Sequence, residues 1–417
     1  MFKKSRIFII LIIFFFPLVS ISFYFKNELK SILNLTKFYT IKKLNLFRNT
    51  YQIDTVLYDL RISKKSIDNL LYNYDYYENN SPVGYIESYK NRLFFISGQG
   101  SLYELKNYEN SEFKKIESNL DQVLKKENFV KSMSVRSLFI DDKSNEIFIS
   151  FTYHEPKTKC VGLELVTSNI NNFQNLNFIS KFKTKCIEYK NFTDFNEMSS
   201  GGKIIALNDN YLLFTIGDFW QENISQDLKR DYGKVLKIGR KNYDYVVFSS
   251  GHRNQQGLTL YEDKIFASEH GPRGGDEINL ITLNKNYGWP LVAYGPTYKK
   301  DYKKYYLKNH LEYEEPVFVF SPSIGISDIE FYTSDYLDRW TGDLLVASMK
   351  NNTGMIRQLN PGLSLYRLKF DKKHEKILYS EKIFLDDRIR DIEILDNGLI
   401  FLVTEEDPSL YKIDLLR

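Results

Sequence analysis

The sequence is poor in cysteine and histidine and nearly balanced in charge, and each of these deficits excludes a class of protein. Among its 417 residues are only two cysteines and five histidines. Two cysteines without clustered histidines do not make a structural zinc site. The formal net charge of +4 is spread over many basic and acidic residues, so no basic stripe marks a nucleic-acid-binding surface. No cysteine follows the apolar N-terminal run, which excludes a lipid anchor on cysteine.

Large apolar and aromatic residues are plentiful by contrast. Hydrophobic residues make up 43% of the chain, with 31 tyrosines and 31 phenylalanines. A chain of this length and composition can bury a large core. Glycine and proline punctuate short apolar runs rich in aromatic residues, a profile that favours strands over helices. We therefore expect an all-β protein.

The first 25 residues are typical of a membrane-directed segment. Lys3, Lys4 and Arg6 precede a long apolar run over residues 7–25, close to the length of about 20 residues that a membrane helix needs. The basic residues favour an orientation with the N-terminus inside. No A-x-A-like cleavage site follows, so we expect a transmembrane helix or signal anchor over residues 1–25; a cleaved signal peptide ending near Pro17 is the alternative. Either way, we expect the bulk of the chain in the periplasm or the extracellular space.

Residues 26–81 are expected to connect this segment to the folded domain. Apolar residues recur there at helical spacing among lysine, asparagine and tyrosine, which indicates a basic juxtamembrane helix followed by a polar stalk. A plain linker is the alternative. The folded domain is expected to cover residues 82–417.

The two cysteines, Cys160 and Cys186, each follow a Lys-Thr-Lys segment and flank two β-like runs. Facing positions of a long hairpin would have this pattern. In an oxidising compartment the pair would form a disulfide. Two buried free thiols are the alternative.

After Pro82 one pattern recurs six times: a turn residue, an apolar strand, and then a small or polar residue. Its spacing of about 50 to 80 residues is typical of propeller blades with insertions in their loops. We interpret the copies as innermost strands, where crowding around the axis demands small side chains. The repeat predicts a six-bladed β-propeller, with a pair of β-sandwiches as the alternative. The copies lie at residues 91–97, 145–150, 210–217, 263–268, 342–348 and 397–404.

Three unlike motifs fall within residues 251–290. The first is a polar turn over residues 251–257, GHRNQQG, which follows an apolar run. The second, EHGPRGGDE over residues 269–277, places glycine and proline beside acidic residues. Backbone carbonyls left free by such a turn suit a hard cation such as Ca²⁺. The third is the tight turn NYGWP over residues 286–290.

In this order and spacing, the three motifs resemble the glucose/sorbosone dehydrogenase family, whose members are six-bladed β-propellers that carry pyrroloquinoline quinone (PQQ) and Ca²⁺. The resemblance covers residues 80–417. It implies a quinoprotein oxidoreductase that oxidises an aldose or a related sugar or aldehyde, with an electron acceptor that the sequence does not identify.

The resemblance also implies a set of site residues. PQQ is a flat tricarboxylate, so a protein that holds it needs cationic groups. The positions that match the cofactor-binding residues of the family are Arg253, Asn254, Lys350, Arg388 and Arg390. The positions that match its carbonyl ligands of Ca²⁺ are Gly271 and Pro272, and the nearby Asp276 and Glu277 could hold a cation or bond to the adjacent glycine backbone.

One position departs from the family pattern. The catalytic base of the family is a histidine about twenty residues before a Gly-Asp pair, and here Ser199 stands at that place, before Asp218. Losing a positioned base typically lowers the rate about 10²- to 10⁴-fold. Glu197 could act as the base with Asp218 instead, or a histidine, His252 or His270, could take the role.

The third reading of the same departure is that catalysis has been lost. The chain would then be a non-catalytic, membrane-anchored propeller that binds a glycan or a partner protein. A Ca²⁺-dependent lactonase is a further class, but it needs a ring of carboxylates at the propeller axis. In the sequence the carboxylates are scattered.

Overall fold

The structure is a computed structural model, and it describes residues 50–71, 84–124, 134–170, 173–296, 310–351, 359–405 and 408–416. The chain divides into two compact units, Met1–Gln52 and Ile53–Arg417, and the propeller lies in the second. No helix among these described residues is long and apolar enough to cross a membrane. The transmembrane helix predicted for residues 1–25 lies outside the described residues, as does most of the predicted juxtamembrane segment.

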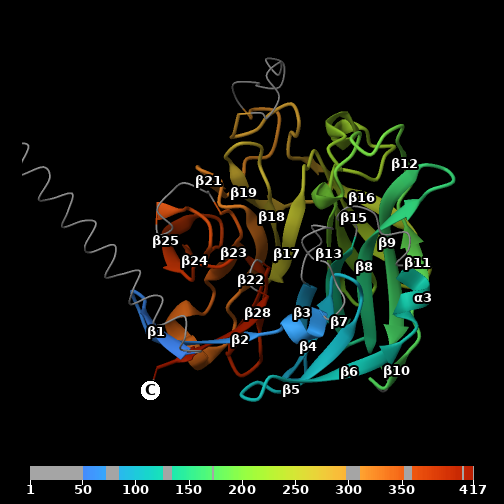
Figure 1. Cartoon of the computed structure of the whole chain (residues 1–417). Helices are drawn as coiled ribbons and strands as arrows, with labels where there is room; N and C mark the ends of the chain where they lie inside the picture. Colours follow the sequence, from blue (N-terminus) through green and yellow to red (C-terminus); the bar gives the residue numbers. More distant parts are fainter. Residues whose placement is uncertain are drawn as a thin grey trace, which may run out of the picture. The chain divides into compact units, whose positions relative to one another are not determined.

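Six antiparallel sheets form the blades of the propeller (Figure 1). The innermost strand of each blade contacts the innermost strands of the two neighbouring blades, so that the ring is closed. These innermost strands are β3 (Gly84–Tyr89), β7 (Val135–Asp141), β13 (Gly201–Asn208), β17 (Gln255–Tyr261), β22 (Ile326–Phe331) and β26 (Ile389–Ile394). The all-β, six-bladed architecture is therefore confirmed.

The remaining strands build each blade outward in turn. The second strands are β4 (Arg92–Ser97), β8 (Glu146–Glu155), β14 (Tyr211–Ile216), β18 (Lys264–Glu269), β23 (Leu344–Ser348) and β27 (Ile400–Thr404). The third strands are β5 (Leu102–Asn107), β9 (Cys160–Asn169), β15 (Lys234–Gly239), β19 (Asp276–Ile281), β24 (Ser364–Phe370) and β28 (Ser409–Leu415). The fourth strands are β6 (Glu112–Ser118), β11 (Ile179–Lys183), β16 (Tyr245–Ser250), β21 (Phe318–Phe320), β25 (Ile377–Phe384) and β2 (Asp59–Ser66).

Short elements complete the described part of the chain. The short strands are β1 (Thr50–Asp54), β10 (Asn175–Leu176), β12 (Ile187–Glu188) and β20 (Lys285–Asn286). One short α-helix, α3 (Leu120–Leu124), is described. The 3₁₀ turns are η1 (Asp68–Leu71), η3 (Glu197–Ser199), η4 (Glu222–Gln226) and η5 (Asp335–Trp340).

The repeated apolar pattern marks the second strands rather than the innermost ones. Every copy coincides with β4, β8, β14, β18, β23 or β27. A second strand is covered on both faces by the neighbouring blades, so its residues are buried almost throughout, as in β23. An innermost strand turns part of its side chains toward the axis and therefore carries polar residues. The number of blades was predicted correctly, but the position of the repeat within the blade was wrong.

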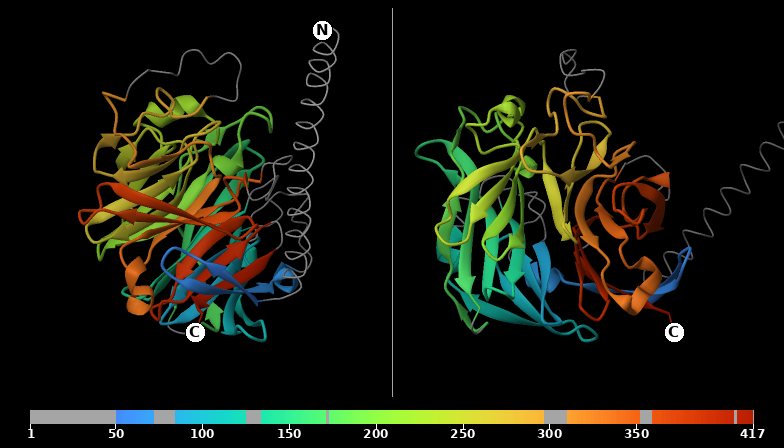
Figure 2. Two further views of the ribbon diagram at one scale, coloured as in Figure 1. Left: turned by 90° about the vertical axis from the view of Figure 1, so that its left-hand side faces the viewer. Right: turned by 180° about the vertical axis from the view of Figure 1, so that it is seen from behind.

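The last blade is closed by a strand from the other end of the described chain. β2 pairs antiparallel with β28, with Leu60 opposite Leu415 and Ser66 opposite Ser409. Figure 2 shows this blue strand beside the red C-terminal strands. Leu60 and Ile62 are fully buried in this blade. Residues 59–66, which the sequence analysis assigned to the linker, thus belong to the propeller.

The structure contains a disulfide between Cys160 and Cys186, whose Cα atoms are 5.5 Å apart. Cys160 begins β9, and the segment that follows Cys186 pairs with the start of β9 through β12. The disulfide therefore joins the start of β9 to the segment between β11 and β12.

Candidate active site at one mouth of the propeller

The predicted site residues lie at the edge of the sheets where the innermost strands begin, which we call the mouth. In an antiparallel blade the start of the innermost strand adjoins the end of the second strand. Four blades show this pairing: Gly201 with Ile216, Gln255 with Glu269, Ile326 with Ser348 and Ile389 with Thr404. The turns beside these pairs carry the predicted residues at positions 199, 218, 253, 254, 271, 350, 388 and 390.

Hydrogen bonds between blades bring these turns together. Asn254 accepts a bond from Gly201 N at 3.1 Å through Oδ1 and donates from Nδ2 to Met198 O at 3.2 Å. Gln256 donates from Nε2 to Asn254 Oδ1 at 2.8 Å, and its Oε1 accepts from Arg390 Nη1 at 3.1 Å. A continuous polar network thus joins three blades at the mouth.

The arginines of the mouth are held in place by acceptors of fixed position. Arg253 donates from Nη1 to the carbonyls of His270 and Gly271 at 3.0 and 3.2 Å, and its guanidinium lies 5.4 Å from the ring centre of Trp289. Arg388 and Arg390 both pair with the buried Glu405. Burial alone would raise the pKa of Glu405, but the two arginines outweigh it and hold the pKa below its ordinary value.

Lys350 completes the cationic set. Arg388 donates from Nη1 to Met349 O at 2.6 Å, which places the residue before Lys350 beside the arginine pair. The Lys350 side chain is half-buried and has no hydrogen-bond or ion-pair partner among the described residues.

The arginines of the mouth also affect the pKa of His270. Burial lowers its pKa to about 4, against the attraction of Asp276, and Arg253, Arg390 and Arg388 lower it further. Three arginines from two blades thus act on one imidazole. All five residues that the resemblance assigns to the cofactor meet at the mouth.

Ser199 and Asp218 form a buried pair beside this set. Ser199 donates from Oγ to Asp218 Oδ1 at 2.7 Å, and both side chains are almost completely buried. Trp289 donates from Nε1 to Asp218 Oδ2 at 2.8 Å. Burial raises the pKa of Asp218, while Arg253 and the hydrogen bonds partly oppose this shift.

The backbone after Asp218 is strained. Phe219 and Trp220 have φ angles of +51° and +63°, in the left-handed region that side chains other than glycine rarely adopt. A hydrogen bond and the burial of one side chain hold this turn in place. Trp220 N donates to Asp218 Oδ1 at 2.9 Å, and Phe219 is fully buried. Such strain persists only where the surroundings impose it, and it gathers at functional sites.

A buried lysine supports the same loop. Lys234 donates from Nζ to the backbone carbonyls of Ile224, Ser225 and Tyr232 at 3.1, 2.7 and 2.7 Å. Burial lowers its pKa to about 8. Lys234 thus binds three carbonyls of the loop between β14 and β15. It was not among the residues predicted from the sequence. Its only signal in the sequence is a charged residue at the head of an apolar strand.

Glu197 and His252 are two of the other candidate bases. Glu197 is buried on the η3 turn, on which Ser199 is the residue that donates to Asp218. His252 is fully buried, with Nε2 2.8 Å from Ser249 Oγ and Nδ1 3.0 Å from Glu269 Oε2. Both ring nitrogens are thus engaged by neighbouring side chains, so His252 cannot accept a proton from a substrate without giving up one of these contacts, which argues against His252 as the base.

The predicted metal residues lie on one tight turn, but Asp276 has another role. Its carboxylate accepts four backbone N–H groups, from Gly271 at 3.1 Å and from Ile324, Gly325 and Ile326 at 3.0, 2.7 and 3.1 Å. Three of these bonds fall on Oδ2 and one on Oδ1, so the carboxylate is largely occupied by backbone donors, and only Oδ1 keeps a lone pair for a further partner. Through these hydrogen bonds Asp276 links the turn to the next blade.

The turn itself depends on glycine. A Cβ atom at Gly271 would lie 2.1 Å from the carbonyl oxygen of Gly275. The half-buried Glu277 accepts a bond from Asn279 Nδ2 at 3.3 Å, and burial together with Glu269 raises its pKa well above the ordinary value. Among the described residues, no group of three or more histidine, cysteine or acidic side chains could hold a metal ion. The resemblance names the carbonyls of Gly271 and Pro272 as candidate ligands, and the Gly271 carbonyl already accepts from Arg253 Nη1 at 3.2 Å.

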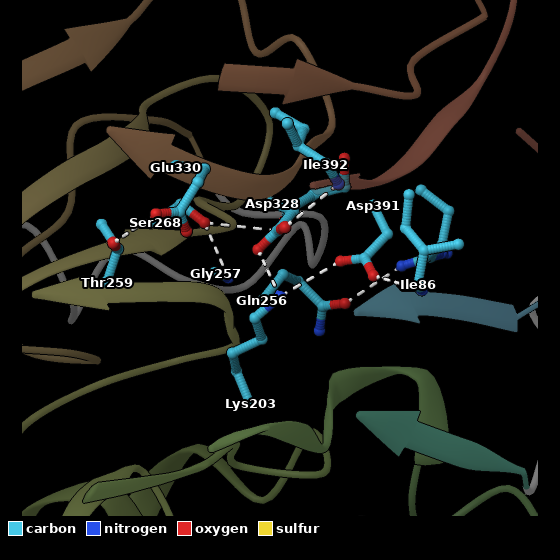
Figure 3. Close-up of polar contacts among 12 residues, drawn as sticks. Ile86, Lys203, Gln256, Gly257, Thr259, Ser268, Asp328, Glu330, Asp391 and Ile392 are labelled. Atoms are coloured by element: carbon cyan, nitrogen blue, oxygen red, sulfur yellow. Dashed lines mark hydrogen bonds and ion pairs between the residues drawn. The ribbon is translucent and has the colours of Figure 1, made fainter. Parts of the chain in front are cut away.

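The axis below the mouth holds a cluster of carboxylates that the sequence analysis missed. Figure 3 shows Lys203 between Asp328 and Asp391. Lys203 Nζ lies 3.0 Å from Asp328 Oδ1 and 3.1 Å from Asp391 Oδ1. Electrostatic interactions join Lys203, Asp391 and three glutamates from the innermost strands, which are Glu87, Glu330 and Glu393. The signal was the sequence Asp-Ile-Glu, which occurs in both β22 and β26. Alternation in a strand sends both acids of each copy to the same face.

Burial favours the protonated forms of two glutamates of this cluster. Burial raises the pKa of Glu330 to about 7 and, together with Glu330, that of Glu393 to about 8. Burial would lower the pKa of Lys203, but Asp328 and Asp391 raise it well above its ordinary value. The cluster therefore contains a firmly charged lysine beside Glu330 and Glu393, two acids that are only partly ionised near neutral pH.

Comparisons with known proteins agree with this architecture. Aldose sugar dehydrogenase YliI of Escherichia coli (strain K12) is 28% identical over 228 residues, which are 50% of this chain and 58% of that relative. The chain thus matches little more than half the length of this relative. Quinoprotein glucose dehydrogenase B of Acinetobacter calcoaceticus is 30% identical over 185 residues, 37% of this chain and 38% of that protein.

A solved structure shows the same fold. The soluble aldose sugar dehydrogenase of E. coli in its apo-form has a TM-score of 0.63 at 18% identity, over 85% of this chain and all of that one. The family model described as Glucose / Sorbosone dehydrogenase matches residues 90–412. That match spans four complete blades, most of the first blade and the part of the last blade that holds Arg388 and Arg390. The chain belongs to the glucose/sorbosone dehydrogenase family.

Proposed function

We propose that this chain is a PQQ-dependent oxidoreductase that oxidises a hydroxyl group of an aldose or a related sugar or aldehyde. The observation that carries the proposal is the convergence of Arg253, Lys350, Arg388 and Arg390 at the mouth. Loops from three blades deliver cationic groups to one place. A small, flat polyanion is the ligand that such a place fits best.

The residues of the mouth suit PQQ in charge and in hydrogen bonding. Lys350 offers an ammonium without a partner among the described residues, and Arg388 remains about one third exposed. Asn254 and Gln256 hold the turns around the cations. When bound, PQQ supplies an ortho-quinone that accepts a hydride. The arginines and Lys350 would hold its carboxylates, and the carbonyls of Gly271 and Pro272 would hold Ca²⁺.

Relatives support the cofactor and the substrate class. One solved structure with a similar fold is the PQQ-bound form of an aldose sugar dehydrogenase from Streptomyces coelicolor, with a TM-score of 0.57 at 15% identity over 85% of this chain and 98% of that one. The E. coli relative is named an aldose sugar dehydrogenase. For this chain we infer a sugar substrate, and we leave the electron acceptor unassigned.

We further infer that the propeller works outside the cytoplasm, anchored to the membrane by residues 1–25. The apolar run after Lys3, Lys4 and Arg6 supports an anchor. The disulfide between Cys160 and Cys186 supports an oxidising compartment. Cell fractionation, followed by protease treatment of intact cells, tests this placement. Recovery of the chain in the cytoplasmic fraction would contradict it.

Binding of the cofactor gives the direct test. Purified full-length chain is titrated with PQQ in the presence of Ca²⁺, and quinone absorbance and dye-linked oxidation of aldoses are recorded. We expect saturable binding that the double variant R388Q/R390Q weakens at least about tenfold, since each lost charge-assisted bond contributes about 1.5–3 kcal/mol. R339Q is the matched control, because the exposed Arg339 lies on η5, beyond the opposite ends of the strands. Absence of any spectral change at micromolar PQQ would refute the proposal.

The second candidate is a propeller that binds a glycan or a partner protein without catalysis. The observation that favours it is Ser199 at the place of the family base. The variant S199H separates the two candidates. If the native chain binds PQQ without oxidising any aldose and S199H stays equally inactive, the non-catalytic function is favoured.

A further inference from the structure

Asp218 is enclosed, and few groups can exchange a proton with it. Its side chain is fully buried. Its oxygens accept from Ser199 Oγ at 2.7 Å, from Trp220 N at 2.9 Å and from Trp289 Nε1 at 2.8 Å. A substrate that enters the mouth therefore cannot touch Asp218 without displacing one of these donors.

Only one of the three donors can pass a proton on. A backbone N–H and an indole N–H donate but do not accept, whereas a hydroxyl does both. Ser199 can therefore give its proton to Asp218 and take another from a molecule on its other side. Trp220 and Trp289 can only stabilise the carboxylate.

The pair is fixed to the cationic mouth by short backbone bonds. Asp218 N donates to Arg253 O at 2.7 Å, and Gly201 N and Met198 O, on either side of Ser199, both bond to Asn254. Arg253 is the charged side chain beside Asp218, and it favours the carboxylate. Burial acts in the opposite direction and is the larger effect, which gives Asp218 more affinity for a proton than an exposed aspartate has.

We propose that Ser199 and Asp218 together replace the family's histidine as the base of the proposed oxidation, with Ser199 relaying the proton and Asp218 holding it. The O–H bond of the substrate breaks, a new O–H bond forms on Ser199 Oγ, and the original Ser199 proton moves to Asp218 Oδ1. The substrate carbon that bears this oxygen loses a hydride, which carries two electrons. The oxidant that accepts the hydride is an ortho-quinone. This assignment rests on the proposed function, because it supplies the base of that reaction.

The first test needs no cofactor. Tryptophan fluorescence of the full-length chain is followed from pH 3 to about pH 8, because Trp289 reports on the Asp218 carboxylate to which it donates. We expect a transition above about pH 4, where an ordinary aspartate titrates. D218N should abolish it. S199A should move the midpoint upward, because the lost hydrogen bond favours the carboxylate. D396N, at an exposed turn at the opposite end of β26, is the control and should leave the transition unchanged.

The second test uses the chain loaded with PQQ and Ca²⁺. S199A and D218N should each lower kcat about 10²- to 10⁴-fold and leave the PQQ titration unchanged. Residues that act as one unit are not additive, so S199A/D218N should be no slower than the slower single variant. S199T keeps the hydroxyl and should retain most of the activity. In the native chain, kcat should rise with pH along the transition seen by fluorescence.

The outcomes separate the relay from the proposed function. If PQQ binds and S199A turns over at the native rate, the relay is wrong and the proposed function stands. If the losses of S199A and D218N multiply in the double variant, the two residues act separately and the relay is also wrong. If no chain binds PQQ, the proposed function fails, while the fluorescence titration still decides whether Ser199 and Asp218 share a proton.

Discussion

The carboxylate cluster at the axis predicts that the propeller becomes less stable as pH rises, and Glu330 offers the sharpest test. Its pKa is raised to about 7 in the folded protein from an ordinary value of 4.5. The folded state therefore binds more protons than the unfolded state between these values, and stability is lost as pH rises through them. Replacing Glu330 by glutamine removes the charge and keeps an oxygen that can accept from Thr259 Oγ1, 3.3 Å away.

The magnitude follows from the size of the pKa shift. A shift of one pKa unit corresponds to about 1.4 kcal/mol, so the displacement from 4.5 to about 7 would give about 3 kcal/mol without screening. The side chain is partly exposed, and solvent screening lowers this to about 2 kcal/mol. As the pH rises from 5 to 9, the free energy of unfolding of E330Q should therefore increase by about 2 kcal/mol relative to that of the native chain.

Urea denaturation followed by circular dichroism at the two pH values measures this difference. E117Q is the matched control, because Glu117 is exposed on the outer strand β6, and its effect should be independent of pH. If E330Q changes the free energy of unfolding by the same amount at both pH values, the charge of Glu330 costs nothing at the axis. Burial at the axis would then not raise the pKa of Glu330, and the reasoning would be refuted.

Three further substitutions test the parts that hold the ring and its loops. I62A should cost about 3 kcal/mol, because Ile62 is fully buried in the closing strand β2; V56A, at a side chain 67% exposed, should stay within about 0.5 kcal/mol by the same urea titration. C160S/C186S should lose about 3 kcal/mol in a non-reducing denaturant titration, and equal stability would contradict a constraining disulfide. K234M should lose about 3 kcal/mol, because three buried carbonyls lose their donor; a stable variant with native fluorescence would show that Lys234 does not hold the loop.

Sequence patterns predicted the number of blades because each second strand has an apolar core. β14 and β23, for example, lie between neighbouring blades and contain the unbroken apolar runs of residues 211–214 and 344–347. The innermost strands were not recognised, because polar groups facing the axis interrupt them. Strand β2 was missed for another reason: its partner β28 lies at the opposite end of the chain, and local sequence does not encode such a pairing.

The mouth was predicted from the resemblance, and its internal bonding was not. The resemblance named Arg388 and Arg390, but nothing in the sequence showed that both pair with Glu405. Asp276 resembled a cation ligand because it stands in an acidic, glycine-rich turn. Its actual partners include backbone N–H groups almost fifty residues later in the chain, a contact that only the folded ring creates.

The closing blade has a consequence for how the protein reaches its folded state. Because β2 and β28 come from opposite ends of the described chain, their contact is the longest-range pairing among the described strands. Loop-closure entropy makes such contacts slow to form. Five blades can assemble as each is synthesised, but the sixth must wait for both ends. A partly made chain would therefore expose an open circle with two unpaired strand edges, the species most in need of a chaperone.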